Sequence, residues 1–217
     1  MAQTTPLDRR VVPPIVVVFG LAGIVVAGIA VLSFLAGFHW QLFKVGEESN
    51  VPTWYSSVQL FTIALVFAPL VIRDGGVRPL LWSVPGLFLL LSLDEVAMLH
   101  ERLGRWLAAV GVGEGVRTGP WFFAWVPIVG IVALVALAAI HPYLRSRPRI
   151  AGLLLAAAAI YGGSAVGLEV VANLVPPGSL AEKGLGFAEE YGEMLGATLF
   201  LWAAVEVHRA ERLAFTV

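Results

Sequence analysis

Residues 79–101 read PLLWSVPGLFLLLSLDEVAMLHE, an apolar run that ends in acidic residues and a histidine. About 20 mostly apolar residues are enough to cross a bilayer as a helix, so residues 79–98 are predicted to form a transmembrane span. A charge near the bilayer centre costs at least about 2.5–3.5 kcal/mol, and such residues are usually functional. Asp94 and Glu95 therefore mark this span as the first place to search for a functional site.

The composition of the whole chain indicates a membrane protein. Of 217 residues, 59% are hydrophobic and 13% are charged, and the mean hydropathy is +0.86. Soluble domains are about half apolar and a quarter charged. The net charge of −1 gives no reason to expect a nucleic-acid partner. The chain has no cysteine, which excludes iron–sulfur clusters held by thiolates, and no histidine pair lies deep in the spans to bind haem.

Six segments are long and apolar enough to span a bilayer, and turn residues separate them. They predict an all-α, polytopic six-helix bundle that forms a single transmembrane domain over residues 1–217. The third span is expected to continue as an unbroken helix to Val110, because no breaker residue follows it. The expected spans are residues 14–38, 53–72, 79–98, 120–140, 150–171 and 185–207.

Positive charges set the expected orientation. With the N-terminus inside, nine of the 14 Lys and Arg residues, including Arg9 and Arg10, fall on the inner side. The positive-inside rule then predicts an N-in/C-in protein of the cell (inner) membrane, with the lipid bilayer as its partner. In this topology 11 of the 15 acidic residues, among them the loop residues Glu47 and Glu48, lie in the outer half or the outer loops.

Acidic residues lie at similar depth on the third, fifth and sixth spans. Residues three, four or seven apart share one face of a helix. Because acids that face lipid would be costly, the three acidic faces are expected to turn inward and meet. The residues of these faces are Asp94, Glu95, His100 and Glu101, then Glu169 and Asn173, and then Glu189, Glu190 and Glu193.

Several carboxylates cannot all remain ionised in a low-dielectric interior without bound cations or shared protons. Oxygen ligands with one imidazole suit a divalent metal, which is the predicted cofactor. The alternative is a structural network of protonated acids and water that joins the helices. The predicted metal ligands are Asp94, Glu101, Glu169, Glu189 and Glu193. The predicted catalytic residues are His100, as a base or ligand, with Glu95 and Glu190 beside it.

Polar residues near these faces are predicted to support the site through hydrogen bonds. They are Ser56, Ser57 and Gln59 of the second span, with Asn173 and Tyr191. Direct polar contact between helices is an equally good interpretation of the second-span residues. Trp121 and Trp125 are predicted to belong to an aromatic belt at the outer interface. The motif Gly192-x-x-x-Gly196 is predicted to pack within the bundle.

The one-sided distribution of polar residues favours an enzyme over a conduit, because a transporter needs a path through both leaflets. We therefore expect a metal-dependent membrane hydrolase or oxidoreductase that acts on a lipid-soluble or periplasmic substrate. One alternative is a cation- or proton-coupled transporter or channel that uses the same carboxylates. Another is a non-catalytic membrane subunit or assembly factor.

Overall fold

The computed structural model describes residues 11–38, 40–44, 50–73, 78–113, 117 and 119–214, and the regular structure in them is helical. The predicted placements of Arg9, Arg10, Glu47 and Glu48 lie outside these residues. The α-helices are α1 (Pro14–Leu35), α2 (Val51–Arg73), α3 (Ser83–Ala97), α4 (Leu99–Ala109), α5 (Trp125–Arg145), α6 (Pro148–Gly162), α7 (Glu169–Ala172) and α8 (Leu180–Ala214). Short 3₁₀ turns are η1 (Gln41–Phe43), η2 (Pro79–Trp82) and η3 (Pro120–Phe123), and η4 (Gly163–Leu168) is a π-helix.

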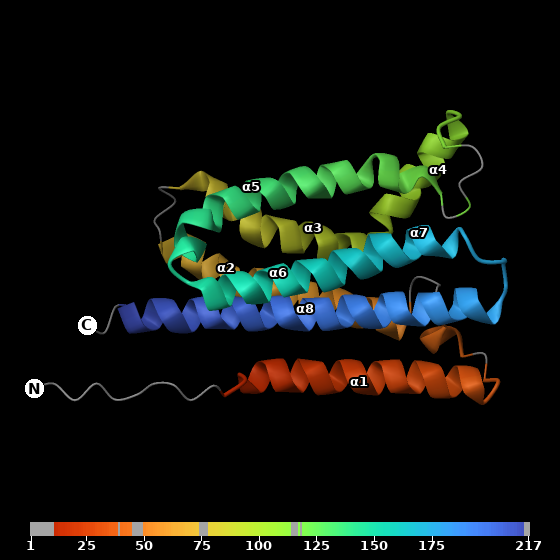
Figure 1. The fold of residues 1–217 in the computed structure, drawn as a ribbon, viewed down its shortest axis with the longest axis horizontal. Helices are drawn as coiled ribbons and strands as arrows, with labels where there is room; N and C mark the ends of the chain where they lie inside the picture. The colour runs from red at the N-terminus through yellow and green to blue at the C-terminus, as the bar shows by residue number, and fades with distance from the viewer. Residues whose placement is uncertain are drawn as a thin grey trace, which may run out of the picture.

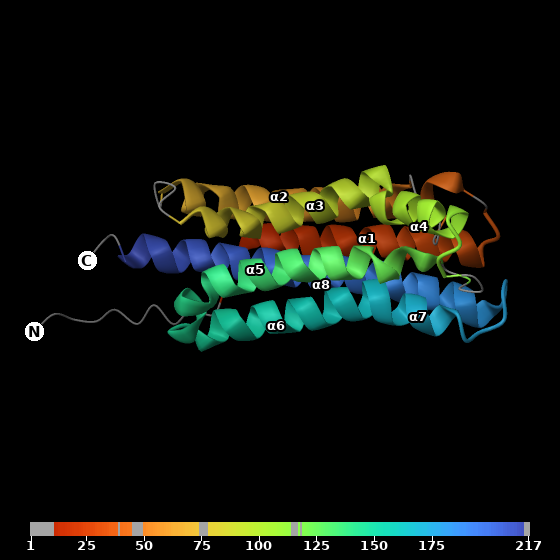
Figure 2. The same ribbon diagram turned by 90° about the horizontal axis from the view of Figure 1, so that it is seen from above.

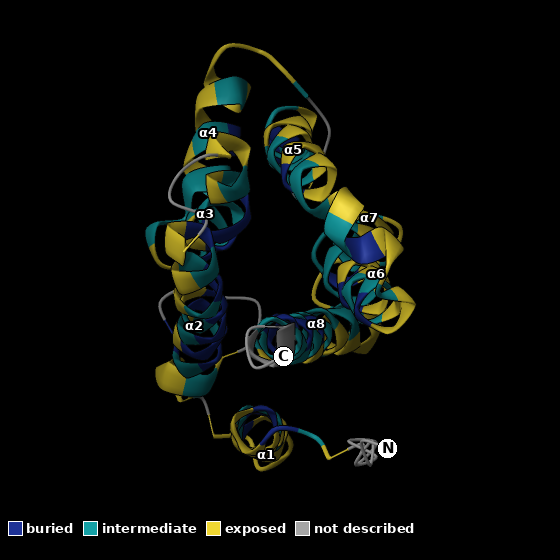
Figure 3. Cartoon of the chain, turned by 90° about the vertical axis from the view of Figure 1, so that its left-hand side faces the viewer, coloured by how far each residue is buried: buried dark blue, intermediate teal, exposed yellow. Residues whose placement is uncertain are grey.

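Five long helices form a closed ring. α2 packs against α3, α3 against α5, α5 against α6, α6 against α8, and α8 against α2. α1 lies outside this ring and packs against α8 and α2, as the view along the bundle shows (Figure 3). The long helices run side by side along one axis (Figures 1 and 2). The ring therefore has an interior that opens toward two opposite ends of the bundle.

Five segments of the described chain are helical, long and apolar enough to cross a membrane, which is consistent with a multi-pass helical membrane protein. These segments are Pro14–Leu35, Val51–Arg73, Pro79–Ala97, Trp125–Arg145 and Pro148–Ala172. Large apolar side chains such as Leu21 and Leu32 point outward from α1, with 58% and 66% of their surface exposed. The sixth predicted span lies inside α8, where glutamates interrupt the apolar run, so it stays a prediction.

Two predicted helices have different boundaries in the structure. Residues 120–140 are predicted as one span, but residues 120–123 form the 3₁₀ turn η3 and α5 begins only at Trp125. The predicted unbroken helix from residue 79 to Val110 is also wrong, because α3 ends at Ala97 and α4 begins at Leu99. Both differences lie at the same end of the bundle, where the acidic residues are.

The motif of Gly192 and Gly196 packs α8 against α6 and η4 within the bundle, which confirms the prediction. A Cβ atom at Gly196 would lie 2.7 Å from the backbone N and 2.8 Å from the Cα of Tyr161. A Cβ atom at Gly192 would overlap the hydroxyl of Ser164. Only glycine allows the two backbones to approach this closely.

Aromatic rings fill the ring interior between its two ends. Phe67 and Phe88 stack with their centroids 5.9 Å apart, and Phe88 meets Phe200 edge to face at 5.1 Å. Phe200 also contacts Tyr161, with the centroids 6.3 Å apart. Phe67 lines a cavity at one end of the bundle, and Tyr161 lines a different cavity at the other end. The aromatic side chains therefore lie between two separate cavities.

Candidate functional site

One cavity of about 430 Å³ lies inside the ring at the end formed by the start of α2, the end of α3 and the start of α8. Residues from several helices line it, and we call it the acidic cavity. Its lining includes every residue predicted as a catalytic group or metal ligand: Asp94, Glu95, His100, Glu101, Glu169, Glu189, Glu190 and Glu193. Ser56, Trp121, Trp125 and Tyr161 also line it. Residues from three separate segments of the chain therefore face one space.

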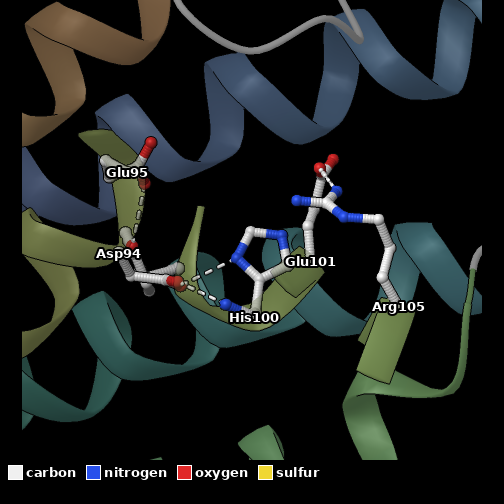
Figure 4. A network of polar contacts seen from close by, with 6 residues as sticks. Asp94, Glu95, His100, Glu101 and Arg105 are labelled. Carbon is white, nitrogen blue, oxygen red and sulfur yellow. Dashed lines mark hydrogen bonds and ion pairs between the residues drawn. The ribbon is translucent and has the colours of Figure 1, made fainter. Parts of the chain in front are cut away.

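Asp94 and His100 form a close pair in the wall of the acidic cavity (Figure 4). One carboxylate oxygen of Asp94 lies 2.9 Å from Nδ1 of His100, and the other accepts a hydrogen bond from the His100 backbone N–H at 2.8 Å. The Asp94 side chain is 12% exposed and that of His100 is 22% exposed. A carboxylate at Nδ1 fixes the orientation and tautomer of the ring. Nε2 is then the ring nitrogen that acts as the acceptor.

A left-handed residue at Met98 makes this pairing sterically accessible. Met98 has φ of 51° and ψ of 46°, and it is the one non-glycine residue with positive φ in the described chain. Its N–H still donates to the carbonyl of Asp94 at 2.7 Å, after which the chain turns and α4 begins. In a continuous helix, residues six apart point to different sides. The break brings His100 back to Asp94, and a left-handed residue other than glycine often marks a functional site.

Trp121 packs behind His100 and not in an interfacial belt. The two rings lie edge to face with their centroids 5.0 Å apart, and Trp121 is only 8% exposed. Its position depends on Gly104 of α4, because a Cβ atom there would lie 3.1 Å from the Cβ of Trp121. The belt prediction for Trp121 is therefore wrong. The cause is the α4–η3 contact, which depends on the break at Met98.

Tyr161 joins the acidic cavity from α6, and the sequence prediction does not include it. Its hydroxyl donates to the carboxylate of Glu95 at 3.4 Å, so a residue of α6 contacts a residue of α3 across the ring. The signal for this residue exists in the sequence, because Tyr161 precedes Glu169 by eight residues, or about two turns of a helix. A tyrosine on the acidic face of an otherwise apolar span is the feature that could have identified it.

The π-helix η4 leads directly into Glu169. It covers Gly163–Leu168, and Glu169 opens the short helix α7. A π-helical turn contains an extra residue, shifts the faces of the helix that follows it, and is frequent at functional sites. Glu169 lines the acidic cavity. The sequence pattern cannot predict this shift, because it assumes an unbroken α-helical period.

The lining of the acidic cavity carries far more negative than positive charge. Glu101 pairs with Arg105 at 2.9 Å on the next turn of α4 (Figure 4). This ion pair is solvent-exposed, with side-chain exposures of 62% for Arg105 and 40% for Glu101. The described residues that line the cavity include no Lys or Arg. A cation or a cationic group is therefore the ligand that the cavity favours electrostatically.

Four predicted supporting residues lie away from the cavity lining. Ser57 forms reciprocal hydrogen bonds with Ser92, each hydroxyl donating to the other residue's carbonyl at 2.9 Å. Gln59 donates to the carbonyl of Met194 at 3.2 Å and to the Thr198 hydroxyl at 2.9 Å. These two residues thus join α2 to α3 and to α8, which agrees with the alternative of helix-to-helix contact.

The other two supporting residues belong to the acidic helices themselves. Asn173 donates its side-chain N–H to the carbonyl of Glu169 at 3.2 Å, within its own turn. Tyr191 is 43% exposed on α8. Neither lines the acidic cavity, whereas Ser56 does and is 3% exposed. Of the five supporting residues predicted from the sequence, Ser56 is therefore the one that lines the acidic cavity.

Within the residues that the structure describes, no group of three or more His, Asp or Glu side chains is close enough to hold a metal ion. The carboxylates face one space but are spread around its wall. Both oxygens of Asp94 are already bonded to His100. In this arrangement Asp94 is a positioning residue for His100. The glutamates in the cavity wall are the groups that a bound cation would draw together.

Comparison with known proteins identifies a family for the chain. The model of DUF8692, described as a domain of unknown function, matches residues 11–208. This match covers nearly the whole chain, and the chain therefore belongs to this family. No curated protein and no solved structure matches it.

Proposed function

We propose that this member of the DUF8692 family is a membrane enzyme that uses a divalent cation and acts in the acidic cavity on a lipid-phase or periplasmic substrate. The observation that carries the proposal is the Asp94–His100 pair in the wall of that cavity, with Nδ1 of the ring held at 2.9 Å from a carboxylate. A histidine oriented in this way serves as a general base through Nε2. The carboxylate stabilises the imidazolium that forms when the ring takes a proton.

The glutamates of the cavity are the proposed cation ligands. Glu169, Glu189 and Glu193 come from two neighbouring segments, η4–α7 and α8, which contact each other. Their mutual repulsion falls when a divalent cation binds, and this gain offsets the cost of reorienting the side chains. Because the ligands are not prearranged, we expect moderate affinity. The bound cation would polarise an oxygen of the substrate.

The remaining polar groups of the cavity have proposed supporting roles. Glu95 is held by the Tyr161 hydroxyl at 3.4 Å, and Glu190 lies on α8 beside Glu189. Tyr161 could donate to a substrate oxygen when it leaves Glu95, because its hydroxyl lies in the cavity lining. Ser56 adds a hydroxyl from α2. These groups can bind and orient a polar substrate but do not replace His100 as a base.

The proposed topology has six spans with both termini inside, in the cell (inner) membrane. α8 is the sixth span, and Arg209 near its end donates to the carbonyl of Val11 at the start of the first span. That end of the bundle also carries four other arginines, Arg73, Arg78, Arg145 and Arg149. Because Lys and Arg are enriched on the inner side of a membrane, they support placing this end inside. The acidic cavity then opens at the outer face.

A cation- or proton-coupled transporter remains the alternative function. It needs a path between the two ends of the ring, and the aromatic side chains of Phe88 and Phe200 occupy that interior. Ion flux in proteoliposomes distinguishes the two functions. Flux that disappears in Glu189→Gln would support transport over a one-sided enzyme.

Cation binding by the purified full-length protein tests the proposal. The protein is prepared without chelator for elemental analysis, then stripped and titrated by calorimetry with Mn²⁺, Zn²⁺, Mg²⁺ and Ca²⁺. We expect stoichiometric binding of at least one ion. Glu189→Gln and Glu193→Gln should each lose at least about tenfold in affinity, the lower end of the range of about 10–100-fold seen when partners of metal ligands are removed. Fluorescence of Trp121 and Trp125, which line the cavity, gives a second readout.

Glu206→Gln is the matched control for these variants. Glu206 is an acid of the same helix α8, but it pairs with Arg209 at 3.0 Å and does not line the acidic cavity. Its variant should bind the cation like the unchanged protein. Absence of stoichiometric binding to all four ions, or an equal loss of affinity in Glu206→Gln, would exclude a cation site in this cavity.

A further inference from the structure

A second cavity, of about 330 Å³, lies at the end of the ring opposite the acidic cavity. It is formed by the end of α2, by η2, by the end of α5, and by the last turns of α8. The two cavities share no lining residue. The second cavity is independent of the chemistry proposed for the first.

The wall of the second cavity is apolar and its rim is basic. Apolar side chains of six elements, α2, η2, α3, α5, α6 and α8, form the wall, including Leu70, Val84, Ile140, Leu154 and Val207. The charged lining residues are Arg73, Arg78 and Glu211.

Glu211, the acid among the described lining residues, has a basic partner. Glu211 pairs with Arg147 at 3.4 Å, and the guanidinium of Arg147 lies 3.7 Å from the centre of the Tyr143 ring. The negative charge of Glu211 is thus offset by a residue outside the lining. The lining therefore attracts an anion, in contrast to the acidic cavity.

The two rim arginines lie at the ends of two candidate membrane spans. Arg73 is the last residue of the span Val51–Arg73, and Arg78 directly precedes the span Pro79–Ala97. An apolar wall that faces the bilayer interior and a basic rim at its surface match a molecule with a hydrocarbon chain and an anionic head. Basic pockets between transmembrane helices bind anionic lipid headgroups in this way.

We propose that the second cavity is a binding site for an anionic phospholipid, whose phosphate contacts Arg73 and Arg78 and whose acyl chain lies along the apolar wall. Guanidinium groups bind phosphate through paired, planar hydrogen bonds. The site does not depend on the function proposed for the acidic cavity.

Native mass spectrometry of the full-length protein in detergent tests this site. Phosphatidylglycerol and phosphatidylcholine with identical acyl chains are added at equal concentration, and the bound fraction of each is measured. We expect several-fold more bound phosphatidylglycerol. Arg73→Gln and Arg78→Gln should each lower its affinity by about fivefold, which corresponds to about 1 kcal/mol for one arginine near an anionic lipid. Either single variant carries the test on its own if the other does not give monodisperse protein.

Arg145→Gln with Arg149→Gln is the matched control. These two arginines lie at the same end of the bundle but do not line the second cavity, so the double variant should keep the preference for phosphatidylglycerol. Equal binding of the two lipids, or an equal loss in the control, would overturn the site in favour of general surface charge. Displacement of the lipid by millimolar inorganic phosphate would overturn it too, because the acyl chain would then contribute nothing.

Discussion

The two ends of the helix ring differ in how their polar groups are held. At the acidic end, the chain leaves α-helical geometry at Met98, at η3 and at η4, and these departures place His100, Trp121 and Glu169 around one cavity. At the opposite end, the 3₁₀ turn η2 precedes α3, while α2, α5 and α8 run as α-helices to their last turns, and the second cavity has apolar walls with charges only at its rim.

This difference shows that irregular backbone positions the polar groups of the acidic end, whereas regular helix packing forms the opposite end; the first suits the enzyme proposed above and the second suits the proposed lipid site. Irregular backbone inside a membrane is tolerated where it lines a cavity or is covered by protein. The acidic end accordingly depends on particular side-chain contacts, whereas the other end depends on apolar surface. Variants at each end should therefore have different consequences.

The largest expected effect comes from Gly196→Leu, which separates α8 from α6 behind the acidic cavity. A Cβ atom would lie 2.7–2.8 Å from backbone atoms of Tyr161, and those atoms cannot rotate away. Overpacking of this kind typically costs about 1–3 kcal/mol and occasionally more. We expect a large decrease in melting temperature in detergent and loss of monodisperse protein.

Gly184→Ala is the control for this variant, because no atom lies within 4 Å of a Cβ placed there on the same helix. Gly192→Ala should be intermediate, since the Ser164 hydroxyl that it meets can rotate away and only the Ser164 Cβ, at 2.8 Å, stays fixed. A melting temperature for Gly196→Leu equal to that of Gly184→Ala would refute the close approach of the two helices.

Asp94→Ala should have the next largest effect. It removes both hydrogen bonds to His100 from a buried position, and an unsatisfied buried partner costs about 1–3 kcal/mol. Asp94→Asn should be milder because its amide oxygen can still accept the His100 backbone N–H. Thermal denaturation measures the stability, and ¹⁵N NMR of labelled histidine reports the tautomer. An unchanged tautomer in Asp94→Ala would disprove that Asp94 orients the ring.

The reciprocal bond between Ser57 and Ser92 should have a smaller effect. Polar contacts between membrane helices average about 0.6 kcal/mol, so Ser57→Ala and Ser92→Ala should each lower the stability by about that amount. Each hydroxyl donates to a backbone carbonyl that the other substitution leaves in place, so the double variant should cost about the sum of the single variants, apart from the contact between the two hydroxyls at 3.0 Å. A single variant that costs as much as the double variant would show that the two bonds do not form independently.

The sequence predicts what depends on composition and periodicity. The apolar segments and the helical fold follow from hydropathy, and the tight contact at Gly192 and Gly196 follows from their spacing. The acidic residues are recognisable because charge is rare inside a span. All of them predicted as catalytic groups or ligands line a single cavity, although their roles in it stay predictions.

What the sequence does not predict are the departures from regular helix and the contacts that follow from them. No glycine or proline marks the break at Met98, so neither the Asp94–His100 pair nor the burial of Trp121 follows from the pattern. Ser57 and Gln59 have the right residue type, but their partners are set by the rotation of α2, which places them toward Ser92 and Met194. A polar residue in a span thus predicts a contact better than it predicts the contact's partner.

The smallest expected effects on stability come from two ion pairs that water reaches, one at each end of the bundle. Arg105–Glu101 and Arg147–Glu211 each join charged side chains that water reaches, and such pairs contribute about 0.2–1 kcal/mol at most. Glu101→Gln should therefore change the melting temperature little, and Glu211→Gln slightly more, because its pair is only 29% exposed on each side. Added salt should reduce the difference in melting temperature between the two variants, because it screens both ion pairs. If Glu101→Gln destabilised the protein more than Asp94→Ala does, the acidic end would depend on charge pairing at its mouth and not on the Asp94–His100 pair in its wall.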